Sequence, residues 1–455
     1  MLIALIQTIL AAIACGLLYI AFRGFRNDRT IALLVAAGVL LRAAGGQILF
    51  WISYLELPFG RALQSGSGFW FYARDGRKYF NQAVTAAEHG IGAIATLDPK
   101  VISPGFTQLL ALFGWMFGPV ASTALLLNIA AYLGTCAILV ALAGQQKRLA
   151  MIAVAAVSFS PSVILWSTQP LKDVFFLFLF AAFVGVAAWW ISAWQREERP
   201  FARATLVTLL MLVVLCAIAA IRWYFALALL ISSAPVLVIA SLRTRMPLRA
   251  TALLVAMYGV VLAGGIYIAG PHLPTQMQML IASPDVAGSP RILADMLEGT
   301  RVSFDKLAGS TKINVGETLS GAEPPRAARF LSGSAALLLP RPLARAAGLI
   351  EVSGGRGLWL FADFDTIFFD IFLIMAIVTL VRSPHLAKWQ NPLLWLVLGV
   401  TLLIAAAFVY CVGNFGALFR YRSMIFLGVV LIPVATAWSA AAAPRVRDVT
   451  LFNNS

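Results

Sequence analysis

Acidic, histidine and cysteine side chains are scarce in this chain, and each shortage excludes a class of site. Of 455 residues, 19 are Asp or Glu, 3 are His and 4 are Cys. The cysteines lie in apolar stretches without metal-type spacing, so we expect small buried side chains and no zinc or haem centre. They are Cys15, Cys136, Cys216 and Cys411. The sequence also lacks a GxxxxGK[ST] phosphate loop, which argues against direct use of ATP.

Apolar residues dominate what remains. Hydrophobic residues make up 61% of the chain and charged residues 12%, with a mean hydropathy of +0.89. This composition is too apolar for a soluble domain and is typical of a polytopic membrane protein. Lys and Arg outnumber Asp and Glu by 34 to 19. Because no basic, aromatic-interleaved soluble domain is present, we expect no nucleic-acid partner and assign the excess cations to cytoplasmic loops.

Apolar runs of about 17 to 25 residues are long enough to cross a bilayer. We predict a single all-α integral membrane domain, 1–455, with about eleven spans. The spans are 1–22, 31–53, 119–143, 149–165, 173–194, 204–221, 224–241, 250–269, 359–381, 392–411 and 423–442. The first run lacks a basic leader and a clear cleavage site, so we interpret it as a retained span.

Basic residues in the connections alternate consistently with this set of spans. The cation-rich connections are 23–30, 144–148, 195–203, 242–249, 382–391 and the tail with Arg445 and Arg447. The positive-inside rule places them in the cytoplasm, so the N-terminus is periplasmic, the C-terminus is cytoplasmic and the protein lies in the inner membrane. Two large loops, 54–118 and 270–358, are then periplasmic. Counting 101–118 as a span would invert the topology, so we expect an interfacial or re-entrant helix there. Within the second loop we expect a surface helix over 327–339.

The densest polar patch follows the second span. Asp75, Tyr79 and Ala83 are spaced i, i+4, i+8 and would share one face of a helix. The cations around Asp75 are Arg74, Arg77 and Lys78. A carboxylate amid cations at a membrane surface provides a base or metal ligand beside anion-binding groups. The alternative is a solvated, charged helix at the lipid headgroups.

Three further patches lie on the predicted periplasmic side. Asp173 is either a second acid facing Asp75 or a helix N-terminal carboxylate paired with Lys172. Arg222 either binds phosphate or belongs to an interfacial anchor with Trp223 and Tyr224. A final pair of arginines, expected in an outer turn near 412–422, would either contact phosphate or snorkel to headgroups. They are Arg420 and Arg422.

Within the spans, Arg42 lies at mid-helix, where an ionised group needs a partner or a cavity. Asp370, the deepest of the acids in span 359–381, is the candidate partner for a structural ion pair.

The patches, in this order, resemble the C-type membrane glycosyltransferases, including the protein O-mannosyltransferase-like and aminoarabinose transferase-like branches. Asp75-x3-Tyr79-x3-Ala83 is similar to the family's first outer-loop acid motif. Ser103-Pro104-Gly105 and the apolar residues after it resemble a proline-led juxtamembrane helix. The stretch from Ser160-Pro161 to Lys172-Asp173 resembles the second outer loop with its acid, and Arg420-Tyr421-Arg422 is similar to a turn in bacterial exopolysaccharide-type members. The resemblance covers mainly residues 54–180.

The resemblance implies an enzyme that transfers a sugar from a polyprenyl-phosphate donor to a lipid, glycan or protein acceptor on the periplasmic face. It implies Asp75 and Asp173 as catalytic acids, with Asp75 as the base or as a ligand of a divalent cation, Mg or Mn. Substrate-binding roles would fall to Tyr79, Arg74, Lys78, Lys172, Arg222, Arg420 and Arg422. Many members pair two acids in the first loop, whereas this chain has Asp75-Gly76, which favours a base or an arginine-assisted mechanism without metal.

Two other functions remain open from the sequence. A lipid-linked polysaccharide polymerase or ligase would use arginines of loop 270–358 instead. These are Arg291, Arg301, Arg326, Arg329, Arg341 and Arg345. A secondary transporter or flippase would show inverted repeats and broken helices, and the Arg42–Asp370 pair is its best support.

Overall fold

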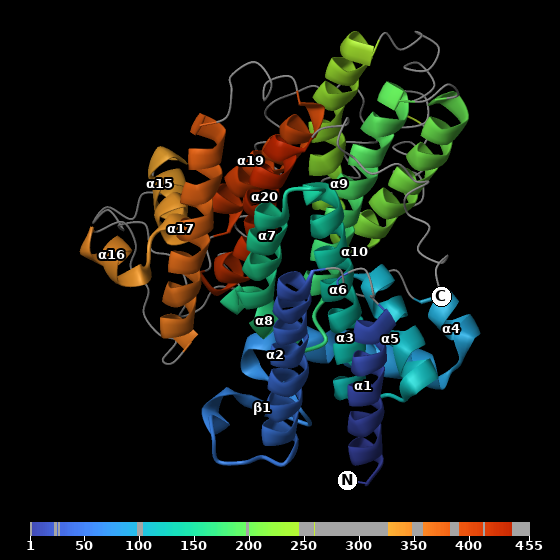
Figure 1. Cartoon of the computed structure of the whole chain (residues 1–455). Helices are drawn as coiled ribbons and strands as arrows, with labels where there is room; N and C mark the ends of the chain where they lie inside the picture. The colour runs from blue at the N-terminus through green and yellow to red at the C-terminus, as the bar shows by residue number, and fades with distance from the viewer. Residues whose placement is uncertain are drawn as a thin grey trace, which may run out of the picture.

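The computed structural model describes residues 2–21, 25, 28–97, 103–196, 200–244, 259, 326–347, 358–382, 391–412 and 415–438. Within them the chain is all-α, as predicted, apart from one short two-stranded ribbon (Figure 1). The predicted span 250–269, except for Gly259, and most of loop 270–358, including Arg291 and Arg301, lie outside the described residues.

Long helices build most of the molecule. They are α1 (Leu2–Ala21), α2 (Arg29–Tyr54), α3 (Arg74–Glu88), α5 (Pro104–Phe117), α6 (Ala124–Ala143), α7 (Lys147–Phe159), α9 (Lys172–Arg196), α10 (Pro200–Thr244), α15 (Arg326–Leu338), α17 (Leu358–Arg382), α19 (Pro392–Cys411) and α20 (Phe415–Ala437). Shorter helices are η2 (Arg61–Leu63), η3 (Phe71–Ala73), α4 (Ile91–Ala95), η4 (Ala121–Thr123), α8 (Pro161–Ser167) and α16 (Arg341–Ala346). The ribbon pairs β1 (Gln64–Gly66) antiparallel to β2 (Phe69–Trp70), with Gln64 opposite Trp70.

Several helices begin where side chains cap them. Asp28 accepts hydrogen bonds from the first-turn amides of α2, at 3.0 and 3.3 Å. Asn391 does the same for α19, with Pro392 at the first helical position, where its missing N–H costs nothing. The predicted span 392–411 therefore coincides with α19.

Seven helices in the described residues are long and apolar enough to cross a membrane, or eight if the bent pair α7–α8 is one span. The chain is therefore a multi-pass helical membrane protein. The predicted span 149–165 is this pair, which bends by 54° at Ser160. Spans 204–221 and 224–241 correspond to the two parts of α10, whose backbone is non-helical at Arg222 (φ −148°, ψ 79°).

Segment 101–118 was expected to form a helix that does not span the membrane. It contains α5, whose 14 residues are too few to cross a bilayer, as expected for an interfacial helix. The outer turn expected near 412–422 is wrong over most of its length, because α20 begins at Phe415 and already contains both arginines. The apolar run from Ser423 made the span look shorter than the helix. Cys216 is exposed, against the expectation of four buried cysteines.

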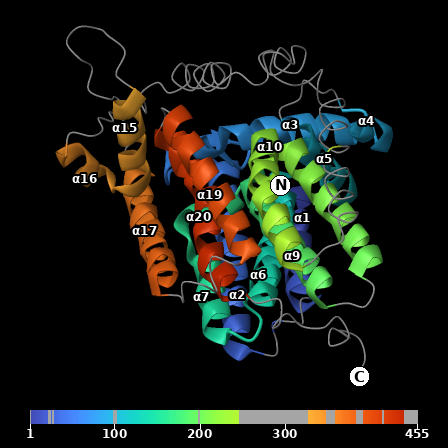
Figure 2. The same ribbon diagram turned by 90° about the horizontal axis from the view of Figure 1, so that it is seen from above.

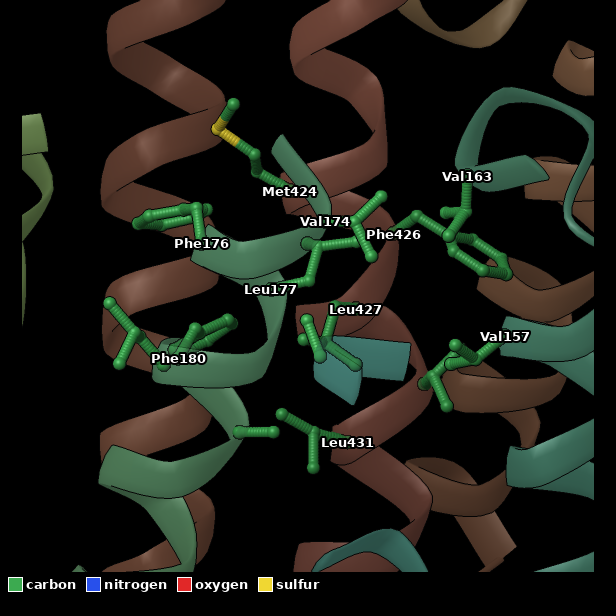
Figure 3. Packing of buried hydrophobic residues seen from close by; sticks show 14 of the residues in the cluster. Val157, Val163, Val174, Phe176, Leu177, Phe180, Met424, Phe426, Leu427 and Leu431 are labelled. Carbon is green, nitrogen blue, oxygen red and sulfur yellow. The ribbon is translucent and has the colours of Figure 1, made fainter. Parts of the chain in front are cut away.

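The centre of the bundle is formed by α20, α9 and α6, which pack against one another. Figure 3 shows Val157 of α7, Phe176 and Phe180 of α9, and Met424 and Leu427 of α20 close together. All five side chains are buried. Van der Waals contact of this kind holds membrane helices together, because lipid tails remove the hydrophobic driving force.

The two ends of the bundle differ in what they bring together. At one end Lys147 pairs with Asp28 at 2.8 Å, and the side chains of Gln146 and Asn391 both donate to the C-terminal part of α20. At the other end α3, α4 and α5 lie across the long helices (Figure 2). We call this second end the α3 end.

Candidate functional site

Helix α3 carries the acid patch. The predicted shared face is confirmed, because Tyr79 and Ala83 are both 2% exposed and lie one and two turns after Asp75. Tyr79 packs edge-on against Phe106 of α5, with ring centroids 5.7 Å apart. Gly76 fits beside the backbone of Pro170, so that α3 approaches the α8–α9 connection closely.

The partner of Asp75 comes from the far end of the sequence. Its carboxylate accepts from Nη1 of Arg420 at 2.6 Å, across 345 residues. The cations next to Asp75 in the sequence have other contacts. Arg74 stacks on Phe71 at 3.6 Å, and Arg77 donates to the Ser65 carbonyl. Lys78 is exposed. The Asp75 side chain remains 47% exposed, so it is open to solvent or to a ligand.

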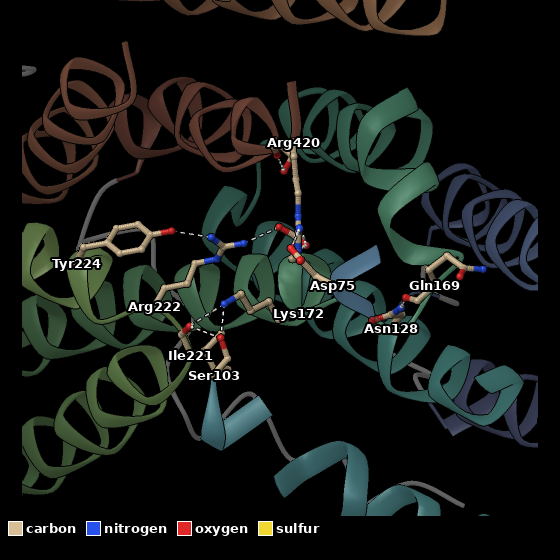
Figure 4. A network of polar contacts seen from close by, with 11 residues as sticks. Asp75, Ser103, Asn128, Gln169, Lys172, Ile221, Arg222, Tyr224 and Arg420 are labelled. Carbon is tan, nitrogen blue, oxygen red and sulfur yellow. Dashed lines mark hydrogen bonds and ion pairs between the residues drawn. The ribbon is translucent and has the colours of Figure 1, made fainter. Parts of the chain in front are cut away.

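Asp173 lies behind Asp75 and is almost fully buried, with 1% of its side chain exposed. One carboxylate oxygen accepts from Arg222 at 2.6 Å, and the other accepts twice from Arg420, at 2.7 and 2.9 Å. Of the two alternatives for Asp173, the pair with Lys172 is not formed, because Lys172 donates to Ser103 and to the Ile221 carbonyl instead. Arg420 thus bridges the two acids, because its guanidinium pairs with Asp75 and with Asp173. Figure 4 shows Arg420 reaching toward Asp75, with Arg222 and Lys172 nearby.

Arg222 reaches this cluster because the chain bends there. Its non-helical backbone directs the side chain inward, where 2% remains exposed. A second nitrogen donates to the Tyr224 hydroxyl at 2.6 Å, and the guanidinium lies 5.3 Å from the Tyr421 ring. Arg222 is therefore part of the buried cluster and not an interfacial anchor.

Lys172 joins three elements at the same place. Its ammonium donates to the hydroxyl of Ser103 and to the Ile221 carbonyl, and it lies 5.5 Å from the Tyr79 ring. Ser103 precedes α5 with a positive φ of 56°, a conformation that turns the chain into the helix. Lys172 consequently ties α5 to α9 and to the bend of α10.

The cluster contains more positive than negative groups. Lys172, Arg222 and Arg420 face the two carboxylates, which leaves one positive charge in excess when all five are ionised. Burial raises the pKa of Tyr79 to about 12, so its phenol stays protonated at neutral pH. We call these six side chains, with Asp75, Tyr79, Lys172, Asp173, Arg222 and Arg420 as members, the α3-end cluster.

The donor set does not fit a divalent cation. In the described part of the chain, no three His, Cys, Asp or Glu side chains lie close enough to share a metal ion. The two carboxylates that could share Mg or Mn are joined by Arg420, and two further cations surround them. A dication there would be repelled by the three positive side chains that surround its two possible ligands.

Arg422, expected beside Arg420, lies in a separate cluster. It donates to Thr366 at 2.5 Å and to the Ala336 carbonyl at 3.0 Å, and it pairs with Asp365 at 3.6 Å. Residues two apart on a helix point in nearly opposite directions, so only one of the two arginines can face the α3-end cluster. The same Asp365 accepts from the amide of Ser162 at 2.9 Å, which holds the start of α8.

Arg42 does not pair with Asp370, so that prediction was wrong. Its guanidinium donates to the carbonyls of Gly38, Ser158 and Val157, at 2.8 to 3.2 Å, and stacks on Tyr132 at 3.9 Å. The carbonyls at the end of α7 are free because α7 breaks there. Arg42 and Asp365 therefore hold the bend from which α8 leads to Lys172 and Asp173.

Sequence reasoning missed Ser103 and Tyr224 as members of the contact network. The first precedes a proline that starts an apolar helix, and the second is a phenol beside an arginine in an apolar stretch. Both are weak signals without the fold. No family model, curated protein or solved structure matches the chain, so the geometry of the site is the basis for its function.

Proposed function

We propose that this protein is a membrane glycosyltransferase that moves a sugar from a polyprenyl-phosphate donor to a lipid, glycan or protein acceptor. The supporting observation is the α3-end cluster, in which a half-exposed carboxylate, Asp75, adjoins three cations and one buried acid, so that the cluster has one positive charge in excess when all five groups are ionised. A polyprenyl-phosphate sugar is a phosphodiester with a single negative charge, which would balance that excess. Arginine and lysine are the side chains that proteins use to bind phosphate.

The proposed orientation places the α3 end in the periplasm, with eleven spans, the N-terminus outside and the C-terminus inside. It rests on the positive-inside rule applied to the connections. The contacts are consistent with it, because Asp28 and Lys147, from two predicted cytoplasmic connections, pair with each other, and Gln146 donates to Ala437 at the C-terminal end of α20. The residues of the α3-end cluster come from predicted periplasmic segments or their borders.

In the proposed reaction the acceptor hydroxyl attacks the anomeric carbon, and the bond from that carbon to the phosphate oxygen breaks. Asp75 takes the proton of the hydroxyl as the new glycosidic bond forms. Negative charge grows on the leaving phosphate, and preorganised cations stabilise it. Arg420 and Lys172 are placed for this role, and the Tyr79 phenol can donate a hydrogen bond, since no described residue accepts one from it.

Asp173 has a different role in this proposal from Asp75. Both of its oxygens are engaged by arginines, and 1% of its side chain is exposed. It is therefore a positioning residue that holds Arg222 and Arg420 in place for the phosphate. Arg74, which stacks on Phe71, and Lys78, which is exposed, are assigned to the lipid headgroup region of the substrates.

The test is transfer of radiolabelled sugar from a polyprenyl-phosphate donor by the purified protein in vesicles, with Asp75→Asn compared to wild type. Glu88→Gln is the matched control, because it removes an exposed acid from the same helix. We expect Asp75→Asn to lose about 10²–10⁴-fold in rate, the usual contribution of a general base, while Glu88→Gln retains activity. Full activity of Asp75→Asn would exclude Asp75 as the base.

The alternatives predict other outcomes of the same assay. A polymerase or ligase would keep activity in Asp75→Asn and lose it in Arg341→Ala, which lies in loop 270–358. Transport without sugar transfer would give no labelled product with any lipid donor. The contact that favoured transport, between Arg42 and Asp370, is not formed.

A further inference from the structure

Helix α17 is the least enclosed of the candidate spans, with 22% of its most apolar window buried, compared with 83% for α20. Its outward side is a continuous apolar stripe that recurs every three or four residues and is 38% to 79% exposed. The stripe consists of Leu360, Phe364, Ile367, Ile371, Ile374, Val378 and Val381. Lipid tails alone would satisfy these side chains.

Asp370 is the feature that lipid tails do not satisfy. It lies at the middle of α17 beside the stripe, about 18 Å from either end of the helix by the rise of 1.5 Å per residue. Its side chain is partly exposed, and no hydrogen bond or ion pair from a described residue reaches it. An acid at this depth is costly and its short side chain cannot reach the headgroups.

The neighbouring polar groups are already engaged. Arg422, the buried cation of α20, is bound by Asp365 and Thr366. Asp363, one turn from the start of α17, accepts from the amide of Arg341 at 2.8 Å. Of the three acids on α17, Asp365 is thus paired with Arg422 and Asp363 accepts from the Arg341 amide, while Asp370 has no such partner among the described residues.

We propose that the face of α17 around Asp370 binds a transmembrane helix of another polypeptide that carries a Lys or Arg near its middle. Charge complementarity selects this occupant over a second copy of the chain. In a two-fold dimer whose axis is normal to the membrane, the same position of each copy lies opposite, so Asp370 would face Asp370. A basic partner instead provides a donor for the carboxylate, and the apolar stripe supplies packing along its length.

This interface is independent of the proposed transferase activity, so its test uses no sugar donor. The full-length protein is reconstituted in lipid nanodiscs with a photocrosslinker at Ile374, as Ile374→p-benzoylphenylalanine. The probe is a synthetic Leu/Ala transmembrane peptide with one central Arg, and the matched peptide has Leu at that position. The control site is Leu40→p-benzoylphenylalanine on α2, which is 66% exposed but is not beside an acid.

We expect the Arg peptide to crosslink at Ile374 about 5- to 30-fold more than the Leu peptide, which is the effect of about 1–2 kcal/mol for one polar contact between membrane helices. At Leu40 the two peptides should be equal. Asp370→Asn, which keeps the size of the side chain, and Asp370→Leu should both remove the preference. Equal yields for the two peptides at Ile374, a preference that survives both substitutions, or an adduct between two copies of the chain would overturn the proposal.

Discussion

Replacing the two acids of the α3-end cluster by Asn should change the stability of the protein by very different amounts. Asp173→Asn leaves Arg222 and Arg420 in a buried site without the carboxylate that both contact. Removing one partner of a buried ion pair costs about 3–5 kcal/mol, and because Asn keeps one acceptor oxygen we expect the lower end, about 3 kcal/mol. Asp75→Asn breaks a pair whose carboxylate side chain is 47% exposed, so solvent screening limits its cost to about 0–1 kcal/mol.

Equilibrium unfolding of the purified protein in mixed micelles, with increasing SDS, measures both free energies of unfolding. We expect Asp173→Asn to lower the free energy of unfolding by at least about 2 kcal/mol more than Asp75→Asn does, while both reduce sugar transfer. A double variant, Asp173→Asn with Arg222→Met, removes the charge that the first substitution leaves uncompensated. The double variant should lose about 1–3 kcal/mol less unfolding free energy than the sum of the losses in Asp173→Asn and Arg222→Met. This is the coupling energy found between residues in contact.

Stability of Asp173→Asn equal to that of wild type would refute the buried arrangement of Asp173. Additive losses in the double variant would show that Arg222 and Asp173 do not interact. Either result would also remove the positioning role of Asp173 from the proposed mechanism.

Other substitutions test single contacts. Tyr79→Phe removes a hydroxyl that no described residue binds, so stability should change by less than about 0.5 kcal/mol while kcat falls, as measured by unfolding and by transfer assays. Arg422→Leu leaves Asp365 buried without its cation and should cost about 3–5 kcal/mol in the same unfolding experiment. The hydrogen bond from Lys147 lowers the pKa of Asp28, so the carboxylate stabilises the fold above its unfolded pKa, about 3.9. This contribution disappears as pH falls through the lower folded pKa, and wild type and Asp28→Asn should then converge in unfolding temperature.

Much of the fold follows from local sequence. Apolar runs located α6, α9, α17 and α19 to within a few residues, because a helix in lipid must satisfy its own backbone and needs a minimum length. The same local rules gave the buried face of α3 from the i, i+4 spacing. The start of α20 was misplaced since Arg420 and Arg422 interrupt the hydropathy but not the helix.

Composition and hydropathy by themselves determined a multi-pass helical protein, and the polar patches predicted that Asp75, Lys172, Asp173, Arg222 and Arg420 share one site. Only the tertiary structure decided which acid meets which cation. Asp75 pairs with Arg420 and not with its neighbours in the sequence. Asp173 pairs with Arg222 and Arg420 and not with Lys172. Arg42 donates to carbonyls at the end of α7, where that helix breaks. These choices depend on the rotation and packing of whole helices, which bring residues hundreds of positions apart within hydrogen-bond distance and turn neighbours on one helix in opposite directions.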